Sequence, residues 1–192
     1  MDETPGLTGL VLAGGRSTRM GRDKALLAWD GTPLVDRVAE VLAECCDEVL
    51  IASGDGTRLG RPHEIADAVP SAGPLGGLLA GMEAAAQPLV AVVAVDMPHA
   101  SAGVLRALAG ALGDAGAAVP LVEGRTHPLH AVYRASCAAT VRACLDEGQR
   151  SVMGLLARID VREAGPEVWG SADPAGRFAT NINRPEEFPR PD

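Results

Sequence analysis

Lysine, asparagine and aromatic residues are scarce in this chain of 192 residues. It has one lysine against sixteen arginines, two asparagines, and an aromatic content of 3%. Such a skew is typical of a GC-rich genome, in which codon usage favours arginine over lysine and disfavours asparagine. The rare residues that persist are therefore candidates for function. Lys24 lies beside a glycine-rich loop, and Asn181 and Asn183 lie two positions apart.

Long hydrophobic runs and a cysteine framework are also missing. The longest apolar run, Leu89–Val95, is far shorter than the ~20 residues of a membrane-spanning helix. Of the four cysteines two are adjacent and none forms a C-x-x-C pair, which favours free thiols in a reducing compartment. The first 15 residues contain no lysine or arginine, whereas a secretory signal begins with a positively charged region. We therefore expect a cytoplasmic protein that does not bind membranes.

The composition also argues against a broad basic surface. The formal net charge of −8 argues against nonspecific binding to nucleic acid or to anionic lipid. The segment Arg16–Lys24 nevertheless holds four basic residues and one acid, a local charge of +3. Distant acids are screened beyond about 8 Å at physiological salt, so this segment can attract a small anion such as a phosphate group.

The first 115 residues alternate between predicted strands and helices. A chain of this length with 47% hydrophobic residues forms a core without disulfides or a structural metal. Alternation of this kind predicts an α/β fold with a mostly parallel central sheet and helices on both faces. The expected strands are 7–13, 25–29, 48–52, 63–66, 89–95, 117–122 and 127–134, and the expected helices are 32–44, 75–86, 101–112, 135–146, 151–158 and a short one after residue 185.

A glycine-rich loop follows the first predicted strand and reads L-A-G-G-R-S-T-R-M-G-R-D-K over residues 12–24. Glycines let backbone N–H groups approach a ligand, and Arg16, Arg19 and Lys24 add positive charge. In an open parallel sheet such a loop lies at the carboxyl ends of the strands, where ligands bind. The loop matches neither the Walker A nor the G-x-G-x-x-G pattern, and a surface turn with solvated arginines is the alternative interpretation.

Polar residues with possible roles in binding occur at two further places. Asp96 directly follows the most apolar strand, and a carboxylate there can coordinate Mg²⁺ together with substrate phosphates. A helix cap or turn former is the alternative for Asp96. The two asparagines, in an extended segment, would face the same side, or form an Asx-turn before Pro185. His127 and His130 are three apart in a predicted strand, so they point to opposite faces and do not indicate a metal pair.

Taken together and in this order, five motifs resemble the molybdenum cofactor guanylyltransferase family across essentially the whole chain. They are the loop at 12–24, G-P-L-G-G at 73–77, V-D-M-P at 95–98, H-P at 127–128 and N-I-N-R-P-E-E-F at 181–188. The resemblance implies a three-layer, Rossmann-like nucleotidyltransferase fold in one domain, 1–192. Residues 1–115 would form the nucleotide-binding half and 116–192 the acceptor half. It also implies an Mg²⁺-dependent enzyme that transfers GMP from GTP to molybdopterin, usually carrying Mo, and releases pyrophosphate.

The resemblance implies roles for individual residues as well. The nucleotide loop would be lined by Leu12, Ala13, Gly14 and Gly15. Lys24 and Arg19 would contact the phosphates, and Asp67 would contact the guanosine. Asp96 would bind the nucleotide and Mg²⁺, while Asn181 and Asn183 would contact the pterin substrate. The sequence departs from the family pattern after the strand at 48–51, where the usual asparagine is replaced by Ala52 or Ser53, and at Arg184, where threonine is usual.

Two alternatives stay open at this point. A related nucleotidyltransferase would use CTP or another phosphorylated acceptor. Guanine is favoured because relatives that transfer cytidylyl groups more often read L-A-A-G and lack the loop at 73–77. A non-catalytic molybdenum-cofactor chaperone is the second alternative, although it would not need Lys24 and Asp96. For the leading prediction, the resemblance also implies transient contacts with molybdopterin-synthesis proteins or acceptor molybdoenzymes.

Overall fold

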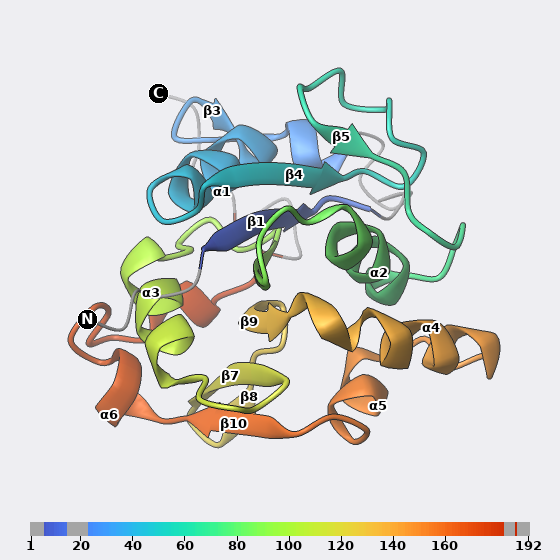
Figure 1. Ribbon diagram of the computed structural model, residues 1–192. Helices are drawn as coiled ribbons and strands as arrows, with labels where there is room; N and C mark the ends of the chain where they lie inside the picture. Colours follow the sequence, from blue (N-terminus) through green and yellow to red (C-terminus); the bar gives the residue numbers. More distant parts are fainter. Residues whose placement is uncertain (1–5, 15–22, 183–186, 188–192) are drawn as a thin grey trace.

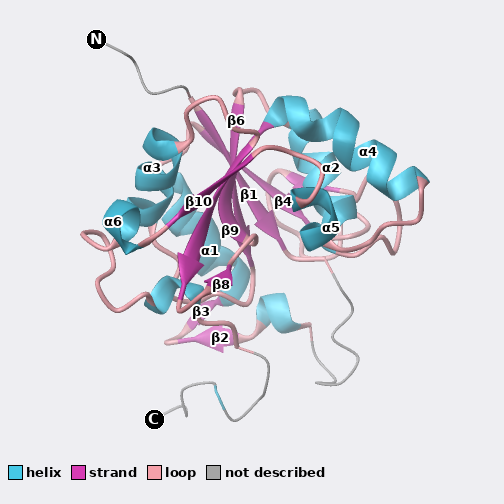
Figure 2. Cartoon of the chain, turned by 90° about the horizontal axis from the view of Figure 1, so that it is seen from below, coloured by secondary structure: helices cyan, strands magenta, loops and turns pink. Residues whose placement is uncertain are grey.

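One mixed sheet separates two layers of helices in the computed structural model, which describes residues 6–14, 23–182 and 187 (Figure 1). Seen from below, α3 and α6 lie on one side of the strands, and α2, α4 and α5 lie on the other (Figure 2). The predicted three-layer α/β fold with a mostly parallel sheet is thereby confirmed. None of the described helices has the length and hydropathy that crossing a bilayer requires.

The strands follow the order β10-β7-β9-β6-β1-β4-β5, with β8 paired to β7. The pairs of β1 with β4, β1 with β6, β4 with β5, and β7 with β10 are parallel, whereas β9 is antiparallel to β6 and β7. The chain leaves β1 towards β4 and later returns to the other side of β1 as β6. A crevice at such a reversal is where open α/β sheets bind ligands. The strands are β1 (Leu7–Leu12), β4 (Glu48–Ala52), β5 (Glu64–Ile65), β6 (Leu89–Ala94), β7 (Ala117–Val122), β8 (Arg125–Thr126), β9 (His130–Arg134) and β10 (Val161–Ala164).

Helices cover both faces of the sheet, so its central strands are apolar on both sides. In β1, Leu7 and Val11 face one core cluster and Leu10 and Leu12 face the other. A Cβ on Gly81 of α2 would lie 2.3 Å from Cδ2 of Leu10, so only glycine lets this helix approach β1 so closely. The helices are α1 (Leu34–Ala43), α2 (Pro74–Ala84), α3 (Ala102–Ala111), α4 (Ala138–Asp146), α5 (Val152–Leu156) and α6 (Pro166–Trp169).

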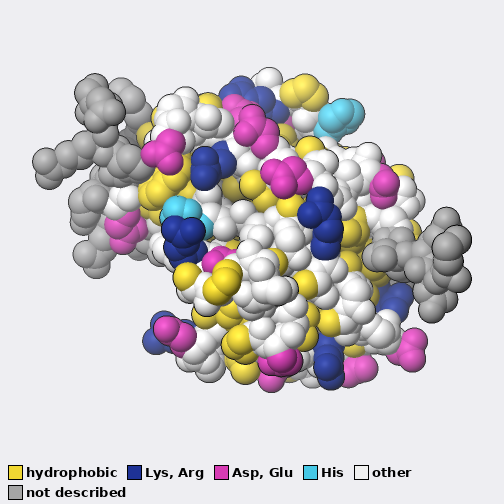
Figure 3. Space-filling view, turned by 90° about the vertical axis from the view of Figure 1, so that its left-hand side faces the viewer, with side chains coloured by type: hydrophobic (Ala, Val, Ile, Leu, Met, Phe, Trp, Pro, Cys, Tyr) yellow, Lys and Arg dark blue, Asp and Glu magenta, His cyan; other side chains and the backbone are white. Residues whose placement is uncertain are grey.

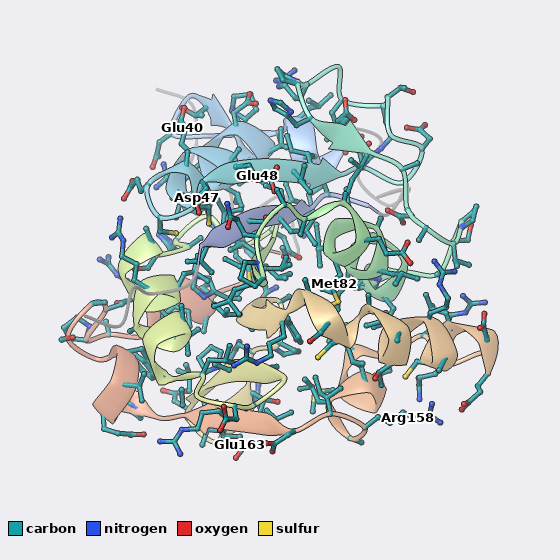
Figure 4. All side chains as sticks on the ribbon, in the orientation of Figure 1. Glu40, Asp47, Glu48, Met82, Arg158 and Glu163 are labelled. Carbon is teal, nitrogen blue, oxygen red and sulfur yellow. The ribbon has the colours of Figure 1, made fainter. Side chains whose placement is uncertain are left out.

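Carboxylates tie the amino edge of the sheet together. Asp47 and Glu48 lie where the chain enters β4, beside β1 (Figure 4). Asp47 Oδ2 accepts a hydrogen bond from the Leu7 backbone N–H at 3.0 Å, and Glu48 Oε1 accepts one from Thr8 Oγ1 at 2.6 Å. On the face that Figure 3 shows, acidic and basic side chains are interspersed.

The segment after the glycine-rich loop differs from the predicted strand at 25–29. A 3₁₀ turn, η1 (Lys24–Leu26), comes first, and only Ala28–Trp29 form a strand, β2, which pairs antiparallel with β3 (Thr32–Pro33). Asp30 and Gly31 both have positive φ, 48° and 84°, as a tight hairpin turn requires. Because the hairpin takes up the two residues of β3, α1 begins at Leu34 and Thr32 does not cap it.

The second half also differs in detail from the sequence prediction. The predicted strand at 127–134 is shortened to β9, because a turn containing Pro128 precedes it. A 3₁₀ turn, η2 (Ala135–Cys137), leads into α4. The last part of the chain carries β10, α6 and a third 3₁₀ turn, η3 (Arg177–Ala179), none of which the sequence predicted. The helix predicted after Pro185 lies outside the described residues.

Candidate active site

A cavity of about 1050 Å³ opens at the carboxyl ends of β1, β4 and β6. The strand ends form its floor, and the loops that follow them and the first turn of α2 form its walls. Its volume suits a nucleotide. The predicted site residues that line it are Leu12, Ala13, Gly14, Lys24, Asp67 and Asp96. Gly15, Arg19, Asn183 and Arg184 lie outside the described residues.

Three predicted residues from distant parts of the chain meet beside this cavity. Lys24 Nζ lies 3.1 Å from Asp96 Oδ2, and Asn181 Nδ2 donates to Asp96 Oδ1 at 3.1 Å. The Ile182 backbone N–H donates to the carbonyl of Asp96 at 2.8 Å and fixes the tail on this turn. The side chains of Lys24 and Asp96 are 16% and 22% exposed, so an incoming ligand can reach both. The arrangement places a cation, a carboxylate and an amide around one point.

Asp67 also lines the cavity, next to the start of α2. Its backbone N–H donates to the carbonyl of Gly54 at 2.9 Å, and its Oδ1 is buried without a hydrogen-bond partner among the described residues. A Cβ on Gly77 would lie 3.3 Å from this oxygen and 2.9 Å from Leu12 Cδ2, so glycine keeps the helix close. Burial raises the pKa of Asp67, against the lowering effect of the Gly54 backbone and the Arg58 charge. The result is a carboxylate at the edge of the cavity with one buried oxygen that no described residue pairs.

Arg58 is a cavity residue that the sequence did not single out. It lies in the loop between β4 and β5, and its side chain is 20% exposed. Nε donates to the carbonyl of Ser53 at 3.0 Å, Nη2 donates to the carbonyl of Ala13, and Nη1 pairs with the carboxylate of Asp23. No motif marks this arginine among sixteen, because its importance comes from where the loop carries it.

The structure does not place both predicted histidines in one strand: His127 lies in the loop before β9, and His130 is the first residue of β9. His130 is fully buried, its Nε2 accepts a hydrogen bond from the Ser101 backbone N–H at 3.1 Å, and its ring packs 4.7 Å from that of Phe178. Burial lowers the pKa of His130 to about 4. Its position is therefore structural, since it joins β9 to the start of α3 and to η3.

Comparison with known proteins places the chain among nucleotidyltransferases. Residues 9–161 match the MobA-like NTP transferase domain. A probable molybdenum cofactor guanylyltransferase of Chloroflexus aggregans is 34% identical over 192 residues, covering 95% of this chain and 91% of the relative. A molybdenum cofactor guanylyltransferase of Burkholderia ambifaria is 40% identical over 171 residues, covering 81% and 83%.

Solved structures share the fold. Molybdopterin-guanine dinucleotide biosynthesis protein A from Archaeoglobus fulgidus superposes with a TM-score of 0.81 at 24% identity, over 93% of both chains. The 2-C-methyl-D-erythritol 4-phosphate cytidylyltransferase of Thermus thermophilus gives 0.65 at 19% identity, over 92% of this chain and 93% of the other. From the matched domain and the curated relatives it follows that the chain belongs to the molybdenum cofactor guanylyltransferase family of nucleotidyltransferases.

Proposed function

We propose that this enzyme transfers GMP from GTP to molybdopterin, forming molybdopterin guanine dinucleotide and pyrophosphate. The observation that carries the proposal is the meeting of Lys24, Asp96 and Asn181 beside a cavity of nucleotide size. Contacts of this kind, between residues 72 and 85 positions apart in the chain, need the complete fold. The relatives named above carry this activity in their names.

The reaction asks mainly for positioning and for positive charge. An oxygen of the acceptor phosphate attacks the α-phosphorus of GTP, and the bond to the bridging oxygen breaks so that pyrophosphate leaves with the electron pair. The attacking phosphate is already ionised, so no general base is required. Lys24 would stabilise the charge on the phosphate oxygens, and Asn181 would orient the acceptor. We expect Arg19 to contact the phosphates, Gly15 to form part of the nucleotide loop, and Asn183 to contact the pterin.

Asp96 would hold a magnesium ion. Mg²⁺ prefers one or two carboxylates together with substrate phosphates, and Asp96 offers a partly exposed carboxylate at the end of β6. The described residues hold no group of three or more histidine, cysteine or acidic side chains that could bind a metal. Substrate phosphates and water would supply further ligands. When bound, Mg²⁺ would neutralise charge on the phosphates.

Asp67 supports guanine as the base. Guanine presents two neighbouring donors, N1–H and the N2 amino group, whereas the base-pairing edge of cytosine presents one amino group. The Asp67 carboxylate lines the cavity and would accept hydrogen bonds from these donors. A site built around a polar partner rejects ligands that lack it, so a preference for GTP over CTP is expected.

The two halves of the chain would divide the substrates between them. Residues 1–115 would bind the nucleotide and residues 116–192 the acceptor, since Leu129 and Asn181 reach the cavity region from the second half. We place the reaction in the cytoplasm, where four free cysteines stay reduced. The product would pass to molybdoenzymes through transient contacts.

Pyrophosphate release tests the proposal. The protein is mixed with metal-loaded molybdopterin, Mg²⁺ and either GTP or CTP, beside Asp96→Ala and the matched control Asp114→Ala, which removes an exposed carboxylate outside the cavity. Release with GTP that Asp96→Ala abolishes and Asp114→Ala retains is the expected result. Release with CTP alone would overturn the choice of base. Binding of GTP without release would favour another acceptor or a chaperone role.

A further inference from the structure

The Arg58 guanidinium joins three segments that surround the cavity. Two of its acceptors are the first carbonyls beyond β1 and β4, those of Ala13 and Ser53, and the third is the Asp23 carboxylate. β1 and β4 are neighbours in the sheet; their last paired residues are Leu12 and Ala52, and the Ala13 backbone N–H still donates to the Ala52 carbonyl at 2.9 Å. Arg58 therefore extends the connection between the two strands into the loops that would contact a nucleotide.

The contact with Asp23 extends this connection to the lysine of the site. Asp23 Oδ1 accepts a hydrogen bond from the Ala25 backbone N–H at 3.1 Å and caps η1, the turn that begins with Lys24. The other oxygen of the same carboxylate pairs with Arg58. The guanidinium is thus linked through one carboxylate to the backbone turn that places Lys24 opposite Asp96.

The loop that carries Arg58 is itself firmly held. The Glu64 carboxylate accepts the backbone N–H groups of Leu59 at 3.0 Å and Arg61 at 2.9 Å, and Leu59 is buried in the core. Arg61 also forms two hydrogen bonds with the Asp36 carboxylate on α1, at 2.7 and 2.8 Å. Because the flanking residues are fixed in advance, little conformational freedom is lost when Arg58 makes its contacts.

We propose that Arg58 is a positioning residue for the nucleotide: it spaces the loops after β1 and β4, and through Asp23 it holds Lys24 where the triphosphate binds. The inference rests on the proposed function for the identity of the nucleotide. Arg58 takes this place where the end of β4 offers only the small side chains of Ala52 and Ser53. A planar guanidinium can serve three acceptors at once, which a lysine cannot do in the same geometry.

The charge of Arg58 has a second effect, which supplies an independent readout. It opposes the burial that raises the pKa of Asp67, while the other close neighbours of that carboxylate, Gly14, Gly54 and Gly77, have no charged side chains. Without Arg58 the carboxylate would protonate at a higher pH. On acidification, the variant would then lose GTP binding at a higher pH than the wild type. A loosened loop alone would not cause this shift.

Calorimetric titration with GTP tests the proposal on the full chain. The variants are Arg58→Met, Asp23→Asn, the double variant, and the matched control Arg142→Met, which removes an exposed arginine paired with Glu83. Loss of a charge-assisted contact predicts roughly 10- to 100-fold weaker binding for each single variant. The double variant should bind no more weakly than the worse single one, because both changes break the same link. Arg58→Lys should recover part of the affinity.

The outcomes separate this inference from the proposed function. A wild type that does not bind GTP overturns the proposed function. If the wild type binds and Arg58→Met binds equally well, or if the two losses add, only the role of Arg58 is overturned. Thermal unfolding identifies a variant that fails to fold, and in that case Asp23→Asn and Arg58→Lys decide the question. If Arg58→Met and the wild type lose GTP binding at the same pH on acidification, the proposed effect of the Arg58 charge on Asp67 is overturned.

Discussion

Acidification should destabilise the protein through His130. The pKa of this buried histidine is lowered to about 4, from 6.5 for an unperturbed side chain. Between these values the unfolded chain binds the proton that the folded chain excludes, so stability rises with pH over this window. The contribution of the neutral ring is complete above pH 6.5 and is lost as the pH falls towards 4. The interval between 6.5 and about 4 corresponds to roughly 3 kcal/mol.

The structure gives the physical reason for this penalty. Nε2 of His130 accepts a hydrogen bond from the Ser101 backbone N–H, so a proton on that nitrogen would place two donors against each other. The ring is also fully buried against Phe178, where a charge is poorly solvated. Asp173 is the nearby acid that favours the charged form, and His127 disfavours it.

Urea unfolding of wild type and His130→Gln at several pH values between 7 and 4.5 measures the effect. Glutamine keeps an acceptor for the Ser101 N–H but does not titrate. It lowers stability at every pH by repacking, yet its stability should fall less steeply on acidification. We expect the two curves to converge by about 2 to 3 kcal/mol between pH 6.5 and 4.5. Parallel curves would refute the argument, because the carboxylates titrate alike in both proteins.

Two packing predictions follow from particular contacts. Gly81→Ala would place a Cβ 2.3 Å from the buried Leu10 side chain and should cost about 1–3 kcal/mol in urea unfolding. Gly110→Ala, in α3 with nothing within 4 Å of its Cβ, should instead stabilise by about 0.5–1 kcal/mol, and equal effects of the two would contradict the close approach of α2. Tyr133→Phe leaves the carbonyl of Pro128 without its 2.8 Å hydrogen bond and should cost about 1–3 kcal/mol by the same assay. A neutral result would mean that this carbonyl finds another donor.

Hydrophobic patterning predicted the sheet well because its central strands are buried on both faces. The runs at 48–52 and 117–122 became β4 and β7 with the expected bounds. The predicted strand at 25–29 was wrong because Asp30 and Gly31 form the turn of a hairpin between β2 and β3, which shortens the strand and delays the start of α1. The sequence did not predict β10, because this strand is stabilised by its pairing with β7 and not by a hydrophobic pattern of its own.

The candidate site was predicted to the extent that its residues follow strands. Asp96 and the loop after β1 could be placed at the sheet edge because carboxyl ends of parallel strands lie together. The hydrogen bond from Asn181 to Asp96 could not be predicted, because it spans 85 positions and depends on the path of the tail. The position of Arg58 at the cavity could not be predicted, because its loop has no periodic pattern. Its side chain is placed there by contacts that only the folded chain shows.

The antiparallel strand β9 has a consequence for how the enzyme moves. β6, which leads to Asp96, pairs with β1 over six residues and with β9 over five, so backbone hydrogen bonds fasten both halves of the chain to one strand. A rotation of residues 116–192 against residues 1–115 would have to break the ladder between β6 and β9. The enzyme should therefore meet its two substrates as a rigid platform, and adjustments during turnover should be confined to the loops above the strand ends.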